Sequence, residues 1–332
     1  MSAPTIVAEL SANLATGDLR RALETIDAAA AAGADAIKLQ TWTPGTMCID
    51  PDYEVKTGAW KGRKLAELYR EAETPWEWHP ALASRALVRG MEWWSTPFDK
   101  QAVNFLQTID CPRYKIASFE ILDLDLIRWC ASTRKPLIIS TGMATIDEIK
   151  AAVQATNFQC DLTLLVCTSS YPAPAAEANL QKIRAMTFAN ALQEGRHHPI
   201  RIGLSDHTMG LAVPVAATAL GACMIEKHFT LSRADGGPDA GFSLEPQEFN
   251  AMAQACRDAA AACAEPPTFG PKPSESLELR RGVYWAADLM PGHRVTEHDI
   301  VTARPATDVT PEEAKEGIGM RLSVARRRGE PF

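Results

Sequence analysis

Several features that would assign a protein to a simple class are missing from this 332-residue sequence. No apolar run approaches the ~20 residues of a membrane-spanning helix, and we expect no signal peptide before Val7. The eight cysteines form no CxxC pair, so we expect them to be reduced and buried in a cytoplasmic protein. An excess of positive charge is also missing. The net charge of −7 argues against nucleic acid as a partner.

The composition that is present is that of an ordinary globular protein. Hydrophobic residues make up 46% of the chain and charged residues 23%. A chain of 332 residues is long enough for a barrel-sized domain with a small appendage.

Eight short apolar segments recur along the chain, each followed by a helical segment. Continuous apolar strands are typical of a parallel sheet that is covered on both sides. Eight such units predict a closed (β/α)8 TIM barrel. The alternative is an open doubly wound sheet, but no glycine-rich dinucleotide turn follows the first strand. The predicted strands are residues 5–10, 36–40, 91–95, 114–117, 136–139, 162–166, 200–204 and 222–225.

The connections between these strands are mostly helical, with one exception. Residues 41–74 form a long excursion, which is unusual in a compact domain unless the segment covers a site. Thr145 and Glu148 form a capping box at the start of one helix. Other predicted helices cover residues 19–32, 74–89, 175–188, 210–221 and 248–264.

The end of the chain has a different character. Residues 265–273 are rich in proline and glycine, as linkers are. Beyond them come short β-like pieces, GVYWAA, VTARPA and RLSVAR, and one short helix over residues 311–316. We therefore predict a catalytic barrel over residues 1–264, a linker over 265–279 and a small β-rich domain over 280–332.

Polar residues gather at the predicted carboxyl ends of the strands, where barrels of this type carry their chemistry. Lys38, Lys115 and Lys227 end otherwise apolar strands, so each needs a partner or a ligand. For Lys227, a structural ion pair with Glu226 is the alternative. Lysines with nearby hydroxyls suit a small phosphorylated carboxylate, although any single hydroxyl is more simply a loop cap. The hydroxyls are Thr96, Ser118, Ser140, Ser169 and Ser205.

Two histidines follow the last two predicted strands in matched positions. His207 ends SDH and His228 ends EKH, and the parallel strands place both at the same edge of the barrel. Two imidazoles there suit one divalent metal whose other positions are left to substrate and water. Two unrelated polar residues at strand ends are the alternative.

The segments SDHTMG (205–210), EKHFTLSR (226–233) and GGPDAGFSLEP (236–246) resemble those of the sialic acid synthase family. The resemblance covers nearly the whole chain. These enzymes join phosphoenolpyruvate to an amino sugar and so make a nine-carbon sugar acid. YREAETPWEWH (69–79) and YKIASFEILD (114–123) make the chain most similar to the pseudaminic acid synthases within the family.

The resemblance implies roles for particular residues. His207 and His228 would hold the metal, with manganese first and magnesium or cobalt as alternatives. Glu120 would lie near the reacting centre. The sugar would be contacted by Glu9, Tyr171 and Asp239. Phosphoenolpyruvate would be contacted by Lys38, Gln40, Thr96, Lys115, Ser118, Ser140, Ser169 and Ser205.

The resemblance also implies how the small domain works. The end of the chain would be an antifreeze-like (SAF) domain of the β-clip fold, and its Arg304 would reach the barrel of the partner subunit. We therefore expect a domain-swapped homodimer. Two motifs depart from the family pattern: the loop at 13–17 lacks a histidine, and the stretch from Arg304 to Asp308 lacks two glycines. Both departures concern local loop shape.

Taken together, these features predict a synthase that joins phosphoenolpyruvate to the aldehyde of an N-acetylated amino sugar and releases phosphate. Glu120 would handle the proton of the attacking water, with activation of that water by the metal as the alternative, and Lys115 would stabilise the departing phosphate. The predicted product is pseudaminic acid, with N-acetylneuraminate and legionaminic acid as alternatives. A metal-dependent aldolase and a non-catalytic sugar-binding barrel are the rival classes. Four aromatic side chains are available for the apolar groups of the sugar, with ordinary core or lid packing as the alternative for any single one: Trp76, Trp78, Phe119 and Phe242.

Overall fold

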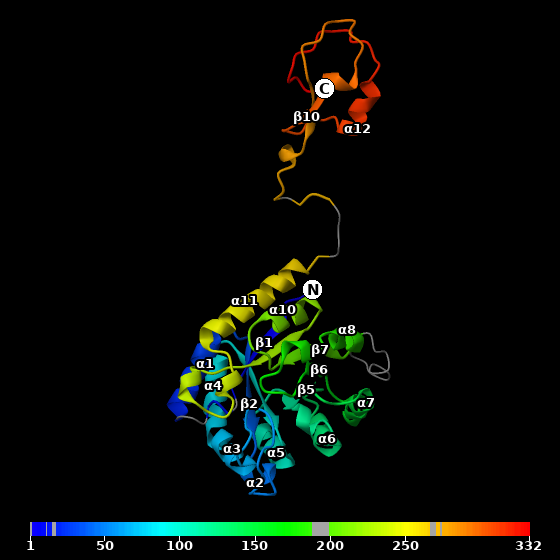
Figure 1. Ribbon diagram of the computed structural model, residues 1–332. Coiled ribbons are helices and arrows are strands. Elements are labelled where there is room, and N and C mark those ends of the chain that lie inside the picture. The colour runs from blue at the N-terminus through cyan, green and yellow to red at the C-terminus, as the bar shows by residue number, and fades with distance from the viewer. Residues whose placement is uncertain (1, 11, 15–17, 188–198, 266–269, 273) are drawn as a thin grey trace. The chain divides into compact units, whose positions relative to one another are not determined.

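The computed structural model describes residues 2–10, 12–14, 18–187, 199–265, 270–272 and 274–332. Two compact units follow one another along the chain, Met1–Pro266 and Pro267–Phe332. The first contains eight parallel strands and the second a two-stranded antiparallel sheet (Figure 1).

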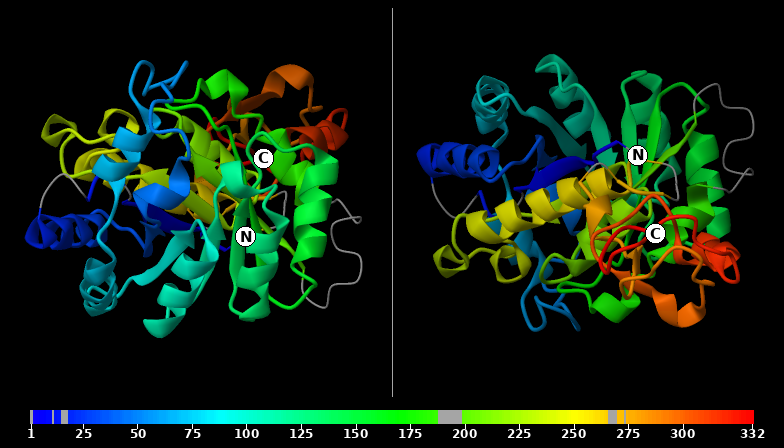
Figure 2. Two further views of the ribbon diagram at one scale, coloured as in Figure 1. Left: turned by 90° about the horizontal axis from the view of Figure 1, so that it is seen from below. Right: turned by 90° about the horizontal axis from the view of Figure 1, so that it is seen from above.

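The eight strands of the first unit close into a barrel in sequence order, with β8 pairing with β1. Helices lie outside the strands (Figure 2), so the predicted (β/α)8 barrel is confirmed. Nearly every strand residue is buried, which is why the strands are continuous apolar runs in the sequence. The strands are Thr5–Glu9 (β1), Ala36–Thr41 (β2), Glu92–Pro97 (β3), Tyr114–Ile116 (β4), Leu137–Ser140 (β5), Leu162–Cys167 (β6), Arg201–Asp206 (β7) and Met224–His228 (β8).

Several helices begin where a side chain caps a free backbone N–H group of the first turn. The Asp18 side chain accepts from the backbone N–H of Arg21 at the start of α1. The predicted capping box of Thr145 and Glu148 is present at the start of α7. The helices are Leu19–Ala31 (α1), Pro44–Met47 (α2), Leu65–Ala72 (α3), His79–Val88 (α4), Lys100–Thr108 (α5), Leu124–Ser132 (α6), Ile146–Ala155 (α7), Gln181–Thr187 (α8), Ala212–Ala219 (α10) and Pro246–Ala262 (α11).

Two predicted helices begin later than expected. The helix expected over residues 175–188 begins at Gln181, after a short 3-10 turn, and Phe188 lies outside the described residues. The left-handed backbone of Asn179, with φ of 43°, separates the turn from the helix. The helix expected from Thr74 likewise starts at His79, following the 3-10 turn Trp76–Trp78. In both places a proline just before the 3-10 turn has extended backbone.

The long excursion after β2 is not a plain loop. It contains α2 and α3, and both pack against one cluster made of Trp42, Ala72 and Ala12 with Met47 and Tyr69 beside them. Helix α3 buries residues on one side and exposes charged residues on the other. The segment therefore forms a small apolar layer over the end of the barrel strands.

Close packing of β7 requires a glycine. A Cβ atom on Gly203 would lie 2.7 Å from the carbonyl oxygen of Met224 and 2.7 Å from a methyl group of Leu165. Since the first neighbour is backbone, a larger side chain would push β7 away from β8. Gly203 thus lets the two histidine-bearing strands lie side by side.

The second unit is small and rich in short extended segments. Strand β9 (Gly282–Trp285) pairs antiparallel with β10 (Ile300–Ala303), and α12 (Pro311–Ala314) is a single short helix. Its core is formed by Trp285, Leu289 and Val295. The RLSVAR piece, expected to be β-like, forms only isolated bridges. These bridges join Arg321 to Arg294 and Arg326 to Leu289.

Candidate active site

A cavity with an ionic and an apolar part opens at the carboxyl ends of the strands. Alternate residues of a strand face the same side, and this alternation decides which side chains reach the cavity. In β8, Glu226 and His228 line it, whereas Lys227 between them does not. At the end of β7, Ser205 and His207 line it in the same way. The polar floor therefore comes from one face of each strand.

Glu226 lies at the centre of a buried group of charges. Its Oε1 atom accepts from Nζ of Lys38 and from Nζ of Lys115, each at 3.1 Å. The same oxygen accepts from the Ser205 hydroxyl at 3.0 Å. Lys38 also pairs with Glu9. We call Lys38, Lys115 and Glu226 the lysine–carboxylate array.

The titration of the array follows from its burial. Burial lowers the pKa of Lys38 to about 8, partly opposed by Glu226. Burial alone would raise the pKa of Glu226, but Lys115 and Lys38 outweigh it and hold that pKa well below its usual range. Glu226 therefore remains a carboxylate at neutral pH. It keeps two lysines beside the cavity that are suited to an anionic ligand.

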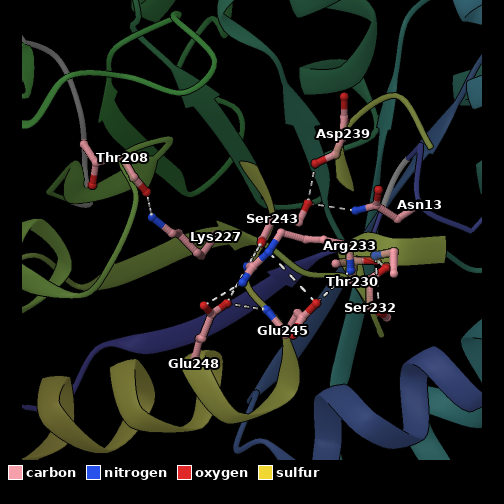
Figure 3. Close-up of polar contacts among 11 residues, drawn as sticks. Asn13, Thr208, Lys227, Thr230, Ser232, Arg233, Asp239, Ser243, Glu245 and Glu248 are labelled. Carbon is pink, nitrogen blue, oxygen red and sulfur yellow. Dashed lines mark hydrogen bonds and ion pairs between the residues drawn. The ribbon is translucent and has the colours of Figure 1, made fainter. Parts of the chain in front are cut away.

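The sequence did not identify Glu226 as a site residue, although a signal existed. His228 faces the site, so the residue two positions earlier in β8 faces it too. The same alternation corrects the expectation for Lys227, which we placed at the mouth of the barrel. Lys227 does not line the cavity, and its Nζ donates to Asp206 Oδ2 at 2.5 Å. It also donates to the Thr208 carbonyl (Figure 3). Its partner is Asp206 of the neighbouring strand and not the adjacent Glu226.

His207 and His228 do come together, with ring centroids 5.5 Å apart. Nδ1–H of His207 donates to the Thr168 carbonyl at 2.8 Å, which leaves Nε2 for a ligand. Burial lowers the pKa of His207 to about 4 and that of His228 well below its usual value. Both rings are therefore neutral at pH 7, the form in which imidazole binds a metal.

This pair fits part of a metal site. His228 Nδ1 is buried with no hydrogen-bond partner among the described residues, and it lies 3.6 Å from Asp239 Oδ2. Within the described part of the chain, no three or more His, Cys, Asp or Glu side chains are grouped to hold one ion. His207 and His228 suit a two-histidine ligand set, and the other ligands would have to be substrate and water.

Two carboxyl groups of the cavity have raised pKa values. Burial raises the pKa of Glu120, in the 3-10 turn after β4, to about 7, against the opposing charge of Lys115. Burial also raises the pKa of Asp239 to about 7, with Lys38 opposing. Glu120 Oε2 is buried without a hydrogen-bond partner among the described residues. A carboxyl with a pKa near 7 can gain or lose a proton at neutral pH.

The predicted hydroxyl groups divide into two sets. Ser118, Ser140 and Ser205 line the cavity, whereas Ser169 and Thr96 do not. Ser169 lies just behind, and its Oγ is 2.7 Å from that of Ser118. Thr96 is fully buried in β3. The Ser140 hydroxyl is buried and has no hydrogen-bond partner among the described residues, so it is a free donor at the cavity.

The three predicted sugar contacts also differ in position. Tyr171 and Asp239 line the cavity. Glu9 lies beneath it and contacts Lys38 and Gln40, whose Nε2 donates to it at 3.4 Å. Gln40 itself lines the cavity. Glu9 thus supports lining residues in this structure.

The excursion after β2 contributes side chains that the sequence did not single out. Trp60 lines the cavity, donates from Nε1 to the Pro238 carbonyl at 2.8 Å and packs against Tyr171. Of the four aromatic residues expected near the sugar, Phe119 lines the cavity, and Phe242 packs edge-on against His228.

The other two aromatic residues are not in the cavity. Trp76 stacks on Phe105 and donates to the Trp42 carbonyl at 2.8 Å. Trp78 packs against the main hydrophobic core. Both therefore follow the alternative of ordinary packing, because the 3-10 turn that carries them leads into α4 outside the barrel.

A hydrogen-bonded loop after β8 holds Asp239 at the cavity (Figure 3). The Ser243 hydroxyl donates to the Asp239 carbonyl at 2.7 Å, and Asn13 Nδ2 donates to Ser243 Oγ at 2.9 Å. Arg233 pairs with Glu248 at the base of the loop. Asn13 thus still fixes this loop, although the residues at 15–17 lie outside the described part of the chain.

Arg304 lies in the second unit, and its Nε donates to the Leu279 carbonyl at 2.6 Å. The side chain is exposed within that unit. Pro305, which follows it, accepts from the Tyr284 hydroxyl through its carbonyl group. The altered motif at 304–308 is therefore held against β9.

Fold and cavity together define a (β/α)8-barrel protein whose site at the carboxyl ends of the strands is built from lysines, carboxylates and a histidine pair. The NeuB family profile matches residues 25–266. The chain belongs to the NeuB family, and the predicted relationship to the sialic acid synthases is confirmed.

Relatives in this family are similar over almost their full length. The pseudaminic acid synthase of Helicobacter pylori is 39% identical over 339 residues, 99% of this chain and 96% of that protein. The N,N'-diacetyllegionaminic acid synthase of Legionella pneumophila is 35% identical, over 96% of this chain and 90% of that one. The crystal structure of the N-acetylneuraminic acid synthetase of Leptospira borgpetersenii with citrate has a TM-score of 0.71 and 30% identity, covering 82% of this chain and 89% of that one.

The helices were also compared with the requirements of a membrane span. No helix within the described residues combines the length and the apolar character needed to cross a lipid bilayer.

Proposed function

We propose that the chain is a nonulosonic acid synthase, which condenses phosphoenolpyruvate with an N-acetylated amino sugar and water and releases phosphate. The observation that carries the proposal is the lysine–carboxylate array beside two neutral histidines. A doubly anionic substrate needs the lysines, and an aldehyde needs a polarising group at the same place. Family membership and the activities for which the relatives are named support the same chemistry.

The residues of the cavity suit the parts of phosphoenolpyruvate. Lys38 and Lys115 supply charge-assisted donors for its phosphate and carboxylate oxygens. Ser118 and Ser140 add directional hydroxyl donors at the rim. Glu226 accepts from both lysines and so orients them beside the cavity. These contacts hold the C2–C3 double bond where the aldehyde can reach it.

The reaction proceeds by carbon–carbon bond formation followed by loss of phosphate. C3 of phosphoenolpyruvate attacks the aldehyde carbon, and water adds at C2. The resulting tetrahedral intermediate loses phosphate through C–O cleavage, with Lys115 stabilising the leaving group. Glu120, whose pKa lies near 7, accepts the proton of the water. A divalent ion bound by His207 and His228, manganese in the first place, would supply Lewis acidity toward the aldehyde oxygen.

We further propose pseudaminic acid as the product, from 2,4-diacetamido-2,4,6-trideoxy-β-L-altropyranose. The 39% identity to named pseudaminic acid synthases supports this choice. Legionaminic acid and N-acetylneuraminate are the alternatives, since relatives with 35% and 30% identity carry those activities. We also propose that the second unit is the antifreeze-like (SAF) domain of a domain-swapped homodimer.

Phosphate release separates this function from its rivals. The purified full-length protein is incubated with phosphoenolpyruvate, manganese and each of a panel of amino sugars, and inorganic phosphate is measured. We expect release only when sugar and phosphoenolpyruvate are both present, and fastest with the 2,4-diacetamido-6-deoxy sugar. Turnover with pyruvate in place of phosphoenolpyruvate would indicate an aldolase. Sugar binding without turnover, in the presence of each metal, would indicate a binding protein.

A further inference from the structure

Helix α3 presents a complete apolar face to the cavity. Four of its residues line the cavity at positions i, i+3, i+4 and i+7, which is the spacing of one helix face. They are Leu65, Leu68, Tyr69 and Ala72. The other side of the helix carries exposed charged residues, Glu67 and Glu71 among them. This part of the cavity wall is thus formed by one face of α3 in the excursion and not by the barrel core.

Neighbouring side chains continue this surface. Trp42 contacts Tyr69 and Phe98 through edge-to-face rings, with centroids 6.0 Å and 5.1 Å apart, and Met47 packs on the same cluster. Trp42, Met47 and Phe98 all line the cavity. We call these three residues, together with the cavity face of α3, the apolar wall.

The apolar wall offers little to a hydroxyl group. Its polar atoms are the Tyr69 hydroxyl and Nε1–H of Trp42, which is buried without a hydrogen-bond partner among the described residues. That N–H group can donate to an acceptor on the sugar. A sugar hydroxyl that lies against Met47 or Leu65 would lose its hydrogen bonds to water and gain none from the protein. A methyl group at the same place would gain contacts.

The ionic part of the cavity decides which end of the sugar meets this wall. Under the proposed function, the aldehyde carbon must approach phosphoenolpyruvate on Lys38 and Lys115, close to His207 and His228. The end of the sugar remote from the aldehyde then extends away from the charges. The lining has two apolar surfaces: Tyr171 and Trp60 lie beside His207, and the apolar wall is the other.

We propose that the apolar wall selects acceptor sugars whose terminal carbon is a methyl group, and that Met47 and Leu65 are specificity-determining residues. This inference rests on the proposed function for the orientation of the sugar. It goes further in assigning the selection to the excursion between β2 and β3. A terminal CH₂OH group is disfavoured because Met47 and Leu65 offer its hydroxyl no hydrogen-bond partner.

The test uses two acceptors that differ at one carbon. One is a 2-acetamido-2-deoxyaldohexose, which ends in CH₂OH, and the other is its 6-deoxy analogue, which ends in CH₃. Both are measured with the full-length protein and saturating phosphoenolpyruvate, for kcat/KM by phosphate release and for Kd by calorimetry. We expect at least about a tenfold preference for the methyl-terminated sugar.

The variants Met47→Gln and Leu65→Gln each add an amide to the wall; the first keeps the length of the side chain, and the second extends it by one atom. Both residues are half-buried, so their loss leaves the core intact. We expect each variant to reduce the methyl preference about fivefold or more, with the KM for phosphoenolpyruvate unchanged. Leu87→Gln is the matched control, because Leu87 is 62% exposed on α4 and is not part of the cavity lining.

The possible outcomes separate this inference from the proposed function. Phosphate release with no preference between the sugars, or a preference that both variants retain, would overturn the role of the wall. Binding that favours the methyl-terminated sugar without any phosphate release would support the wall and overturn the synthase. Neither binding nor turnover of either sugar would overturn both.

Discussion

Glu226 shows how much the site depends on single charges that have been removed from water. Both lysines of the array reach one oxygen of this carboxylate, and all three side chains are buried. Removing one partner of a buried ion pair is far more costly than removing an exposed one, because the other charge stays in a medium of low polarity.

Glu226→Gln should therefore destabilise the protein while keeping the shape of the side chain. We expect the free energy of unfolding to fall by about 3–5 kcal/mol, since two buried lysines lose their common carboxylate. Urea unfolding measures this, and phosphate release should fall with it. Glu67→Gln, on the exposed side of α3, is the control and should change stability by less than about 0.5 kcal/mol. Equal stabilities of the two variants would mean that the array is solvated.

The pKa of Glu120 sets a second prediction at the residue scale. Because Glu120 accepts a proton only when ionised, kcat/KM should rise as the pH increases through about 7. It should fall again near pH 8, where Lys38 loses its proton. The profile is measured by phosphate release at limiting phosphoenolpyruvate. In Glu120→Gln, the kcat/KM that remains should no longer rise with pH through about 7, because the titrating carboxyl is gone. If the rise is unchanged, the group that titrates is Asp239.

The sign for stability is opposite to the sign for activity. Burial raises the pKa of Glu120 from its ordinary 4.5 to about 7, so the folded state binds this proton more tightly than the unfolded chain. Its contribution to stability is complete below pH 4.5 and is lost as the pH rises to 7. The protein is therefore expected to lose this part of its stability over the same pH range in which it becomes active.

Elements of the barrel were predictable because parallel strands buried on both faces leave a simple sequence signature. Each of the eight apolar segments became a strand, and the chemistry lies at their carboxyl ends. Which residue of a strand faces the cavity follows from alternation, and there the placement of Lys227 at the mouth failed. His228 and Lys227 are adjacent, so both cannot face the same side.

Elements outside the barrel were less predictable, since their conformation depends on contacts across the chain. The sequence predicted the length of the excursion after β2 but not its helices. Helix α2 has four residues and α3 has eight, and both are too short for a clear periodicity. RLSVAR alternates like a strand, yet only isolated bridges form there. The pairing of Trp60 with Pro238, 178 positions along the chain, has no local signal at all.

At the scale of the whole molecule, the proposed domain swap predicts complementation between inactive variants. His207→Ala damages the barrel site and Arg304→Ala the small unit. If Arg304 serves the partner's barrel, a mixed dimer has one site with both lesions and one with neither. After full exchange of equal amounts, about a quarter of wild-type activity should return, since half of the dimers are mixed and each has one intact site.

A matched mixture provides the control. His207→Ala and His228→Ala both lie in the barrel, so a mixed dimer has no intact site and no activity should return. Subunit exchange is verified by native mass spectrometry in both mixtures. If exchange occurs and the Arg304→Ala mixture also stays inactive, Arg304 does not act on a partner's barrel.

The lysine–carboxylate array has a consequence for the growing chain on the ribosome. Lys115 is made 111 positions before Glu226, and Lys38 earlier still. Until β8 has been synthesised, Lys115 cannot enter the barrel interior without leaving its charge unpaired, whereas Lys38 already has Glu9 as a partner. Strand β4, which carries Lys115, therefore cannot reach its final packing early. The barrel therefore closes late in synthesis. Once Glu226 has been made, both the closed barrel and the substrate site can form.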